Sequence, residues 1–178
     1  MHAPVLAPSD VRIYTFPDIP DYTQERAILV FPGKGSLSLE EIVASSLKEQ
    51  DNDLPEELHK EQTENKTQCS KFPYTKIVFI DSTWNQCYGM VQDNRLAGLP
   101  RVEISSRNTI FWRYQKGKPK EYLATIEAIY YFLVDFHKIV LKRDYCGDYD
   151  NMLFLFKFMY DKIHELYDHN SLRAYTRD

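Results

Sequence analysis

Asp81, Ser82, Thr83 and Trp84 are the residues of this chain whose types and spacing best allow chemistry. They directly follow an apolar run, Ile77 to Ile80, that has no polar alternation and is typical of a strand covered on both faces of a parallel sheet. Ligands of open α/β sheets bind at the carboxyl ends of the strands. The position of Asp81 therefore predicts a functional carboxylate with hydroxyls and an indole beside it.

The same residues also fit a purely structural role. Asp81 and Thr83 are residue types that cap helices. The i, i+3, i+4, i+7 spacing of a buried helical face is present at Trp84, Cys87, Tyr88 and Val91. A helix cap and a catalytic carboxylate look alike in sequence, so the local pattern leaves both interpretations open.

A second group of candidate residues lies between Arg107 and Lys120. This segment has basic and aromatic residues but no acidic one: Arg107, Arg113, Lys116, Lys118 and Lys120, with Phe111, Trp112 and Tyr114 among them. The net charge of the chain is −4, yet seven acidic residues are concentrated between positions 49 and 64. Because local charge steers a polyanion, the segment predicts a contact with RNA; a solvated loop is the alternative.

The elements that must position these residues alternate between strands and helices. Strands are predicted at residues 12–16, 27–31, 77–80 and 101–106. Helices are predicted to begin at Ser38, which forms a capping box with Glu41, at Trp84, at Thr125 and beyond Gly147. The polar, acidic stretch at about 49–71 is predicted to be a flexible insertion. This order predicts one domain over residues 1–178, of the α/β class, with a layered and largely parallel sheet.

Composition argues against several other classes of protein. Three cysteines, Cys69, Cys87 and Cys146, are odd in number and far apart, which supports neither a disulfide framework nor a metal site and favours a reducing compartment. No apolar run reaches the ~18 residues that a bilayer requires, so no membrane partner is predicted. Oligomeric state is not predicted from these patterns.

Two segments of the chain resemble the signatures of a known family. Asp81-Ser82-Thr83-Trp84 matches the Asp-x-Thr-Trp signature of the DTW domain family, and Leu123 to Ala128 resembles its second, Ser-Thr-x-Glu-Ala signature. Phe31-Pro32-Gly33 is similar to an upstream loop of the family. The resemblance covers roughly Val11 to Lys142 and is strongest to the animal type 1 tRNA-uridine aminocarboxypropyltransferases.

The resemblance implies a fold, an activity and a role for each candidate residue. The fold would be a SPOUT-like layered sheet with helices on both faces and a possible carboxyl-terminal knot. The activity would be transfer of the 3-amino-3-carboxypropyl group from S-adenosylmethionine to N3 of a uridine in tRNA. Asp81 would act as general base and Trp84 would stack on the base. The donor would be held by Pro32, Gly33, Leu123, Thr125 and Glu127, and tRNA by Arg107, Arg113, Lys116, Lys118 and Lys120.

The chain also departs from the family pattern. It has no cysteine cluster and no His-Pro-x-Glu segment before Val11, so it is expected to lack the family's amino-terminal segment, and Ala124 stands where Ser is commoner. One alternative is therefore a truncated, inactive DTW domain that retains RNA binding; another is a SPOUT-type RNA methyltransferase. The family likeness favours the nucleus, or else the cytosol, as the location.

Overall fold

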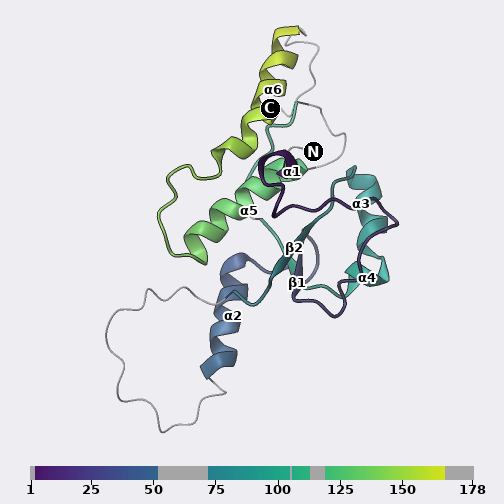
Figure 1. The fold of residues 1–178 in the computed structure, drawn as a ribbon, viewed down its shortest axis with the longest axis vertical. Helices are drawn as coiled ribbons and strands as arrows, with labels where there is room; N and C mark the ends of the chain where they lie inside the picture. The colour runs from purple at the N-terminus through teal and green to yellow at the C-terminus, as the bar shows by residue number, and fades with distance from the viewer. Residues whose placement is uncertain (1–2, 52–71, 105, 113–118, 167–178) are drawn as a thin grey trace.

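Three short parallel strands form the centre of the fold (Figure 1). The computed structural model describes residues 3–51, 72–104, 106–112 and 119–166. The strands are β1 (Ala27–Val30), β2 (Lys76–Phe79) and β3 (Arg101–Val102), in the order β2-β1-β3. Because β1 pairs in parallel with both neighbours, all three strands end at the same edge of the sheet.

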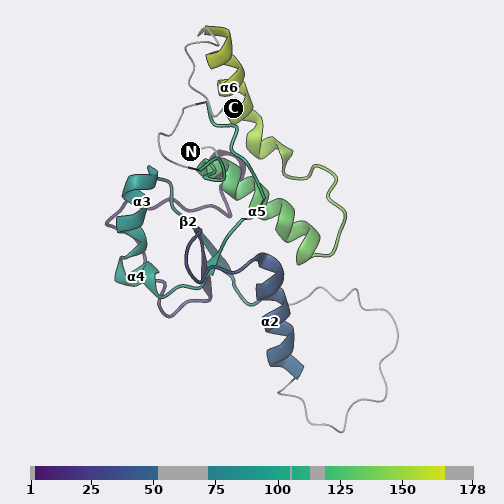
Figure 2. The same ribbon diagram turned by 180° about the vertical axis from the view of Figure 1, so that it is seen from behind.

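Helices make the connections between and beyond the strands. Helix α2 (Leu39–Asp51) follows β1, and α3 (Trp84–Val91) and α4 (Asn94–Ala97) lie between β2 and β3. The described residues also form α1 (Ala3–Leu6), α5 (Thr125–Ile139), the 3₁₀ helix η2 (Asp150–Leu153) and α6 (Phe154–Leu166). In both views α3 and α4 lie on one side of the strands, and α2 and α5 lie on the other (Figures 1 and 2).

Alternating residues of β1 divide the core between these two sides. Leu29 packs in one cluster with Cys87 and Val91 of α3, whereas the neighbouring Ile28 packs in a second cluster with residues of α2 and with Phe132 of α5. This is the consequence of the two-residue period of a strand. A third cluster joins the first two turns of α5 to η2, α6 and α1. Helix α5 is thus fixed on two sides, which makes its first turn a rigid support.

The mixed α/β class and the parallel sheet are confirmed, with differences in detail. Residues 12–16 form no strand; Thr15 pairs with Asp18 in a turn whose Asp18 N–H donates to the Thr15 carbonyl at 2.7 Å. Strand β3 ends at Val102 instead of continuing to residue 106. Residues 49–51 belong to α2, while the rest of the predicted insertion lies outside the described residues. The SPOUT-like layering and the knot stay predictions.

Candidate functional site

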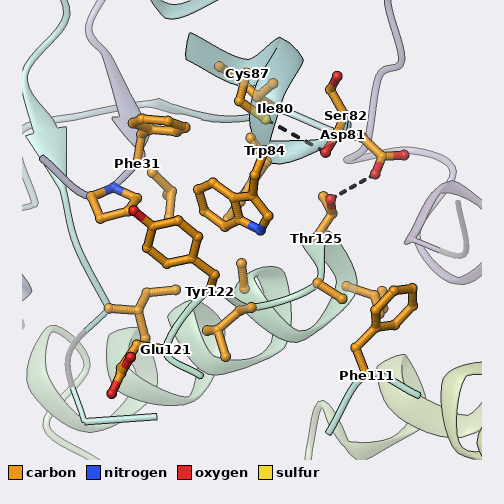
Figure 3. A pocket seen from close by; sticks show the side chains of 18 of the residues that line it. Phe31, Ile80, Asp81, Ser82, Trp84, Cys87, Phe111, Glu121, Tyr122 and Thr125 are labelled. Atoms are coloured by element: carbon orange, nitrogen blue, oxygen red, sulfur yellow. Dashed lines mark hydrogen bonds between the residues drawn. The ribbon is translucent and has the colours of Figure 1, made fainter. Parts of the chain in front are cut away.

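A cavity of about 970 Å³ lies at the carboxyl ends of all three strands. Its walls include Pro32 after β1, Asp81 after β2 and Glu103 after β3. The amino-terminal end of α5 closes the cavity from another side (Figure 3). In the order β2-β1-β3 the chain passes from β1 to β2 on one side of β1, and then to β3 on its other side. The point where the strand order reverses in this way is where open α/β sheets bind ligands.

Asp81 and Thr125 contact each other inside this cavity. The Thr125 hydroxyl donates a hydrogen bond of 2.7 Å to Oδ1 of Asp81 (Figure 3). Asp81 is exposed, so its second oxygen is accessible from the cavity. The hydrogen bond joins the two segments that were singled out in the sequence, although 44 residues separate them.

The structure also answers the capping alternative. Thr83 occupies the N-cap position of α3, but its side chain makes no capping hydrogen bond. Its hydroxyl donates instead to the side-chain oxygen of Gln86 at 2.8 Å, and the Ser82 hydroxyl donates to the same oxygen at 3.1 Å. The Asp81 carboxylate accepts a hydrogen bond from Thr125, and so Asp81 faces the cavity instead of the helix start.

Trp84 belongs to an aromatic cluster on the cavity wall. Tyr122 lies over its indole, with ring centroids 4.1 Å apart and planes tilted by 33°, and Phe31 approaches at 5.8 Å (Figure 3). The hydroxyls of Tyr122 and Tyr88 are 3.0 Å apart, and this hydrogen bond, with some burial, raises the pKa of Tyr122. Tyr122 was missed in the sequence, although it directly precedes the second signature, and Phe31 was noted only as part of the upstream loop and not as a site residue.

Among the predicted donor-binding residues, the structure brings Pro32, Leu123 and Thr125 to the cavity wall. Gly33 lies next to the wall, where its N–H donates to Ser36 Oγ at 3.2 Å. Glu127 does not line the cavity. It is 1% exposed, and its carboxylate accepts hydrogen bonds from Thr109 Oγ1 at 2.6 Å and from two backbone N–H groups, at Ile110 (2.8 Å) and Ala124 (2.7 Å).

Arg107 and Lys120, the two predicted RNA-binding residues that the structure describes, have different surroundings. Arg107 forms an ion pair of 3.0 Å with Asp135 and lies over the Tyr131 ring, 5.2 Å from its centroid. Lys120 is exposed, and its carbonyl accepts from the Thr109 N–H at 2.8 Å. Arg113, Lys116 and Lys118 lie outside the described residues. The RNA contact stays a prediction for all five.

Phe111 and Trp112, the described aromatic residues of this segment, are half-buried. Their rings pack on Phe156 of α6, at centroid distances of 6.3 Å and 5.4 Å, and on each other at 4.7 Å. Both also line the cavity. They therefore form part of the cavity wall and pack on α6 instead of standing free in a loop.

The described charged residues on the cavity wall all have one sign. Asp81, Glu103 and Glu121 line it, and no Lys, Arg or His does so among the residues that the structure describes. Carboxylates together with aromatic rings are the surroundings that stabilise a cationic ligand. Over the same residues, no group of three or more His, Cys, Asp or Glu side chains is arranged to hold a metal ion, and no helix is long and apolar enough to cross a membrane.

Comparison with known proteins adds the family. The profile of the DTW domain matches residues 8–164. Proteins named tRNA-uridine aminocarboxypropyltransferase 1 are similar to the chain: the one from Pongo abelii is 46% identical over 180 residues, that from Homo sapiens 45% over 180 residues, and that from Xenopus tropicalis 42% over 181 residues. These alignments cover 92%, 92% and 93% of the chain and 59%, 59% and 62% of the relatives, in that order.

The chain therefore spans about three fifths of the length of the curated relatives that it matches. No solved structure matches it. The predicted resemblance is confirmed by the profile match, which covers most of the residues, including Asp81, Trp84 and the first turn of α5. The chain belongs to the DTW domain family.

Proposed function

We propose that this chain transfers the 3-amino-3-carboxypropyl group of S-adenosylmethionine to N3 of a uridine in tRNA. The relatives' name gives both the transferred group and the class of acceptor. The observation that carries the proposal is the hydrogen bond between Thr125 and Asp81, because it places both family signatures in one cavity. A cavity at the carboxyl ends of the strands is also where such a sheet binds ligands.

The composition of the cavity wall supports a cationic donor. S-adenosylmethionine carries a positively charged sulfonium and an ammonium group, and the wall provides three carboxylates, Asp81, Glu103 and Glu121. The rings of Trp84, Tyr122 and Phe111 supply apolar surface and negative ring faces beside them. A ligand with phosphate groups would meet repulsion from the same carboxylates, so RNA phosphates would bind outside this cavity.

In the proposed reaction Asp81 acts as general base toward uridine N3. As the N3–H proton passes to the free oxygen of Asp81, N3 attacks the γ-carbon of the donor's methionine portion. The bond from this carbon to sulfur breaks, sulfur keeps the electron pair, and neutral methylthioadenosine leaves. Thr125 holds the carboxylate at Oδ1, so the other oxygen stays oriented toward the acceptor. A base in this position is worth roughly 10²- to 10⁴-fold in rate.

Choice among the three carbons on sulfur depends on positioning. The sulfonium can alkylate through its methyl group, its γ-carbon or its ribose carbon, and the leaving group is intrinsically good in each case. The cavity must therefore aim one carbon at N3 and keep the others away. The aromatic wall of Trp84 and Tyr122 is the rigid surface that would set this orientation, because the two tilted rings are in close contact and the Tyr122 hydroxyl is hydrogen-bonded to that of Tyr88.

The test is to incubate the chain with carboxyl-labelled S-adenosylmethionine and unmodified tRNA. We expect label in the RNA and one methylthioadenosine per group transferred. Formation of S-adenosylhomocysteine without label in the RNA would identify a methyltransferase instead. If tRNA binds but neither product forms, the chain is an RNA-binding domain without transferase activity.

A further inference from the structure

Glu103 is a second carboxylate of the cavity that neither family signature includes. It directly follows β3, as Asp81 follows β2 after a single residue, and both line the cavity. Strand β1 lies between β2 and β3, so the ends of the outer strands are about 10 Å apart. The two carboxylates therefore face different parts of any ligand that lies across the strand ends.

The environment of Glu103 leaves it able to accept hydrogen bonds from a ligand. It is half-buried, and Ser36 Oγ lies 2.6 Å from its Oε2 and also 2.6 Å from the Gly33 carbonyl oxygen. A hydroxyl has one proton and can donate to one of these acceptors at a time. Oε1 of Glu103 has no hydrogen-bond partner within the described part of the chain. A half-buried carboxylate in this state gains from further donors.

The backbone holds Glu103 in place. The Leu37 N–H donates to the Arg101 carbonyl and the Glu103 N–H donates to the Leu37 carbonyl, each at 3.0 Å. Residues 36–38 thus pair along β3, where Leu37 bridges to Val102 in parallel. Because the loop after β1 is fixed to β3 in this way, Ser36 and Glu103 form a preorganised unit.

We propose that Glu103 binds the ribose hydroxyls of S-adenosylmethionine, an inference that rests on the proposed function. Asp81 must lie beside the carbon that is transferred. The ammonium group belongs to the transferred portion itself, whereas the ribose lies beyond the sulfur. A carboxylate at the end of the second strand from Asp81 therefore faces the nucleoside end of the donor. Glu127 is not available for this contact, because three protein donors occupy its carboxylate.

Binding of three ligands to the whole chain and to E103A tests the assignment. S-adenosylmethionine, S-adenosylhomocysteine and methylthioadenosine share the ribose, whereas the amino acid portion is absent from the last and the sulfonium is present in the first alone. Loss of charge-assisted hydrogen bonds to the ribose should weaken all three by the same factor, about 10- to 100-fold in Kd by calorimetry. S36A should weaken all three by a smaller common factor, because the carboxylate remains but loses its support.

Each other result overturns the inference. If E103A weakens the first two ligands but not methylthioadenosine, Glu103 binds the ammonium group; if it weakens S-adenosylmethionine alone, Glu103 faces the sulfonium. Unchanged affinities would show that Glu103 contacts no donor, while the proposed function would stand. Failure of the unaltered chain to bind any of the three would overturn the proposed donor as well.

Matched controls separate binding from folding. E165A removes an exposed glutamate of α6 that does not line the cavity. It should therefore change the three affinities much less than E103A does. The urea midpoint of E103A should match that of E103Q, whose side chain fills the same space. E103A could bind methylthioadenosine more weakly because it is partly unfolded, while folded E103Q binds it as tightly as the unaltered chain does. This combination of results would count against the ribose contact.

Discussion

At the scale of single residues, the Thr125 hydroxyl gives the clearest prediction for mutation. It donates a hydrogen bond of 2.7 Å to Asp81 from the first residue of α5. The T125V substitution removes this hydrogen bond with little change in side-chain volume. We expect kcat to fall roughly 10-fold, the equivalent of one hydrogen bond, with KM for S-adenosylmethionine changed less. Steady-state kinetics of transfer to tRNA would measure both.

The serine variant is the matched control for this prediction. T125S keeps the hydroxyl at the same place and should retain most of the activity. Equal kcat values in T125V and the unaltered chain would show that Asp81 needs no support from Thr125. Equal losses in T125V and T125S would show that packing of the methyl group is responsible instead of the hydrogen bond.

Glu127 gives a prediction on stability. Its buried carboxylate accepts from Thr109, Ile110 and Ala124, and it thereby ties the loop before α5 to the start of the helix. E127A leaves three donors without a partner, and the free energy of unfolding should fall by at least about 3 kcal/mol. Urea unfolding would show it as a lower midpoint. E121A, at an exposed position, should change the free energy by less than about 0.5 kcal/mol.

Thr125 and Glu127 show how far the sequence could predict which side chains face the cavity. Both belong to one signature, and both were predicted to hold the donor. Residues two apart on a helix point to nearly opposite sides, so if Thr125 faces the cavity, Glu127 cannot. Helix geometry alone would have separated them. Glu103, by contrast, was missed because the predicted strand 101–106 placed it mid-strand, whereas β3 ends at Val102.

At the scale of elements, the break between α3 and α4 gives a prediction on pH. The Asp93 carboxylate accepts from the Arg95 N–H at the start of α4 and forms an ion pair with the Arg95 side chain. These hydrogen bonds lower the pKa of Asp93 from 3.8 to about 2. Since the folded pKa lies below the ordinary value, the contribution of Asp93 to stability is complete above about pH 4. It is lost as the pH falls toward 2.

Chemical denaturation at several pH values tests this. Between pH 4 and pH 2 the free energy of unfolding of D93N should fall less steeply than that of the unaltered chain, because the variant has no carboxyl group to titrate there. Parallel pH curves for the two proteins would contradict the assigned pKa. The carbon-13 shift of the Asp93 carboxyl provides a direct reading of the same titration.

Much of the element order could be predicted from the sequence. The apolar runs gave β1 and β2, and the capping box of Ser38 and Glu41 is present, with the Ser38 N–H donating to Glu41 at 2.7 Å. The predicted starts at Trp84 and Thr125 match α3 and α5. The break at Asp93 was not predicted, because apolar periodicity continues through Leu96 while a local cap interrupts the helix.

At the scale of the whole molecule, the proposed function assigns the acidic cavity and the basic segment at residues 107–120 to different parts of the reactants. Arg107 is already paired with Asp135, whereas Lys120 is exposed. K120A should therefore weaken tRNA binding and reduce the slope of log K against log salt by about one. R107A should lower stability by about 1 kcal/mol and change the slope less. A larger change of slope in R107A would show that the ion pair opens on RNA binding.

In the proposed reaction Asp81 is the base that takes the proton of uridine N3. The most direct test is the single-turnover rate of transfer to tRNA for D81N, with binding of both substrates measured alongside. D161N, at an exposed position of α6, is the matched control. We predict a rate roughly 10²- to 10⁴-fold lower in D81N, with both substrates still bound and D161N unchanged. A D81N rate within about threefold of the unaltered chain would show that Asp81 is not the base.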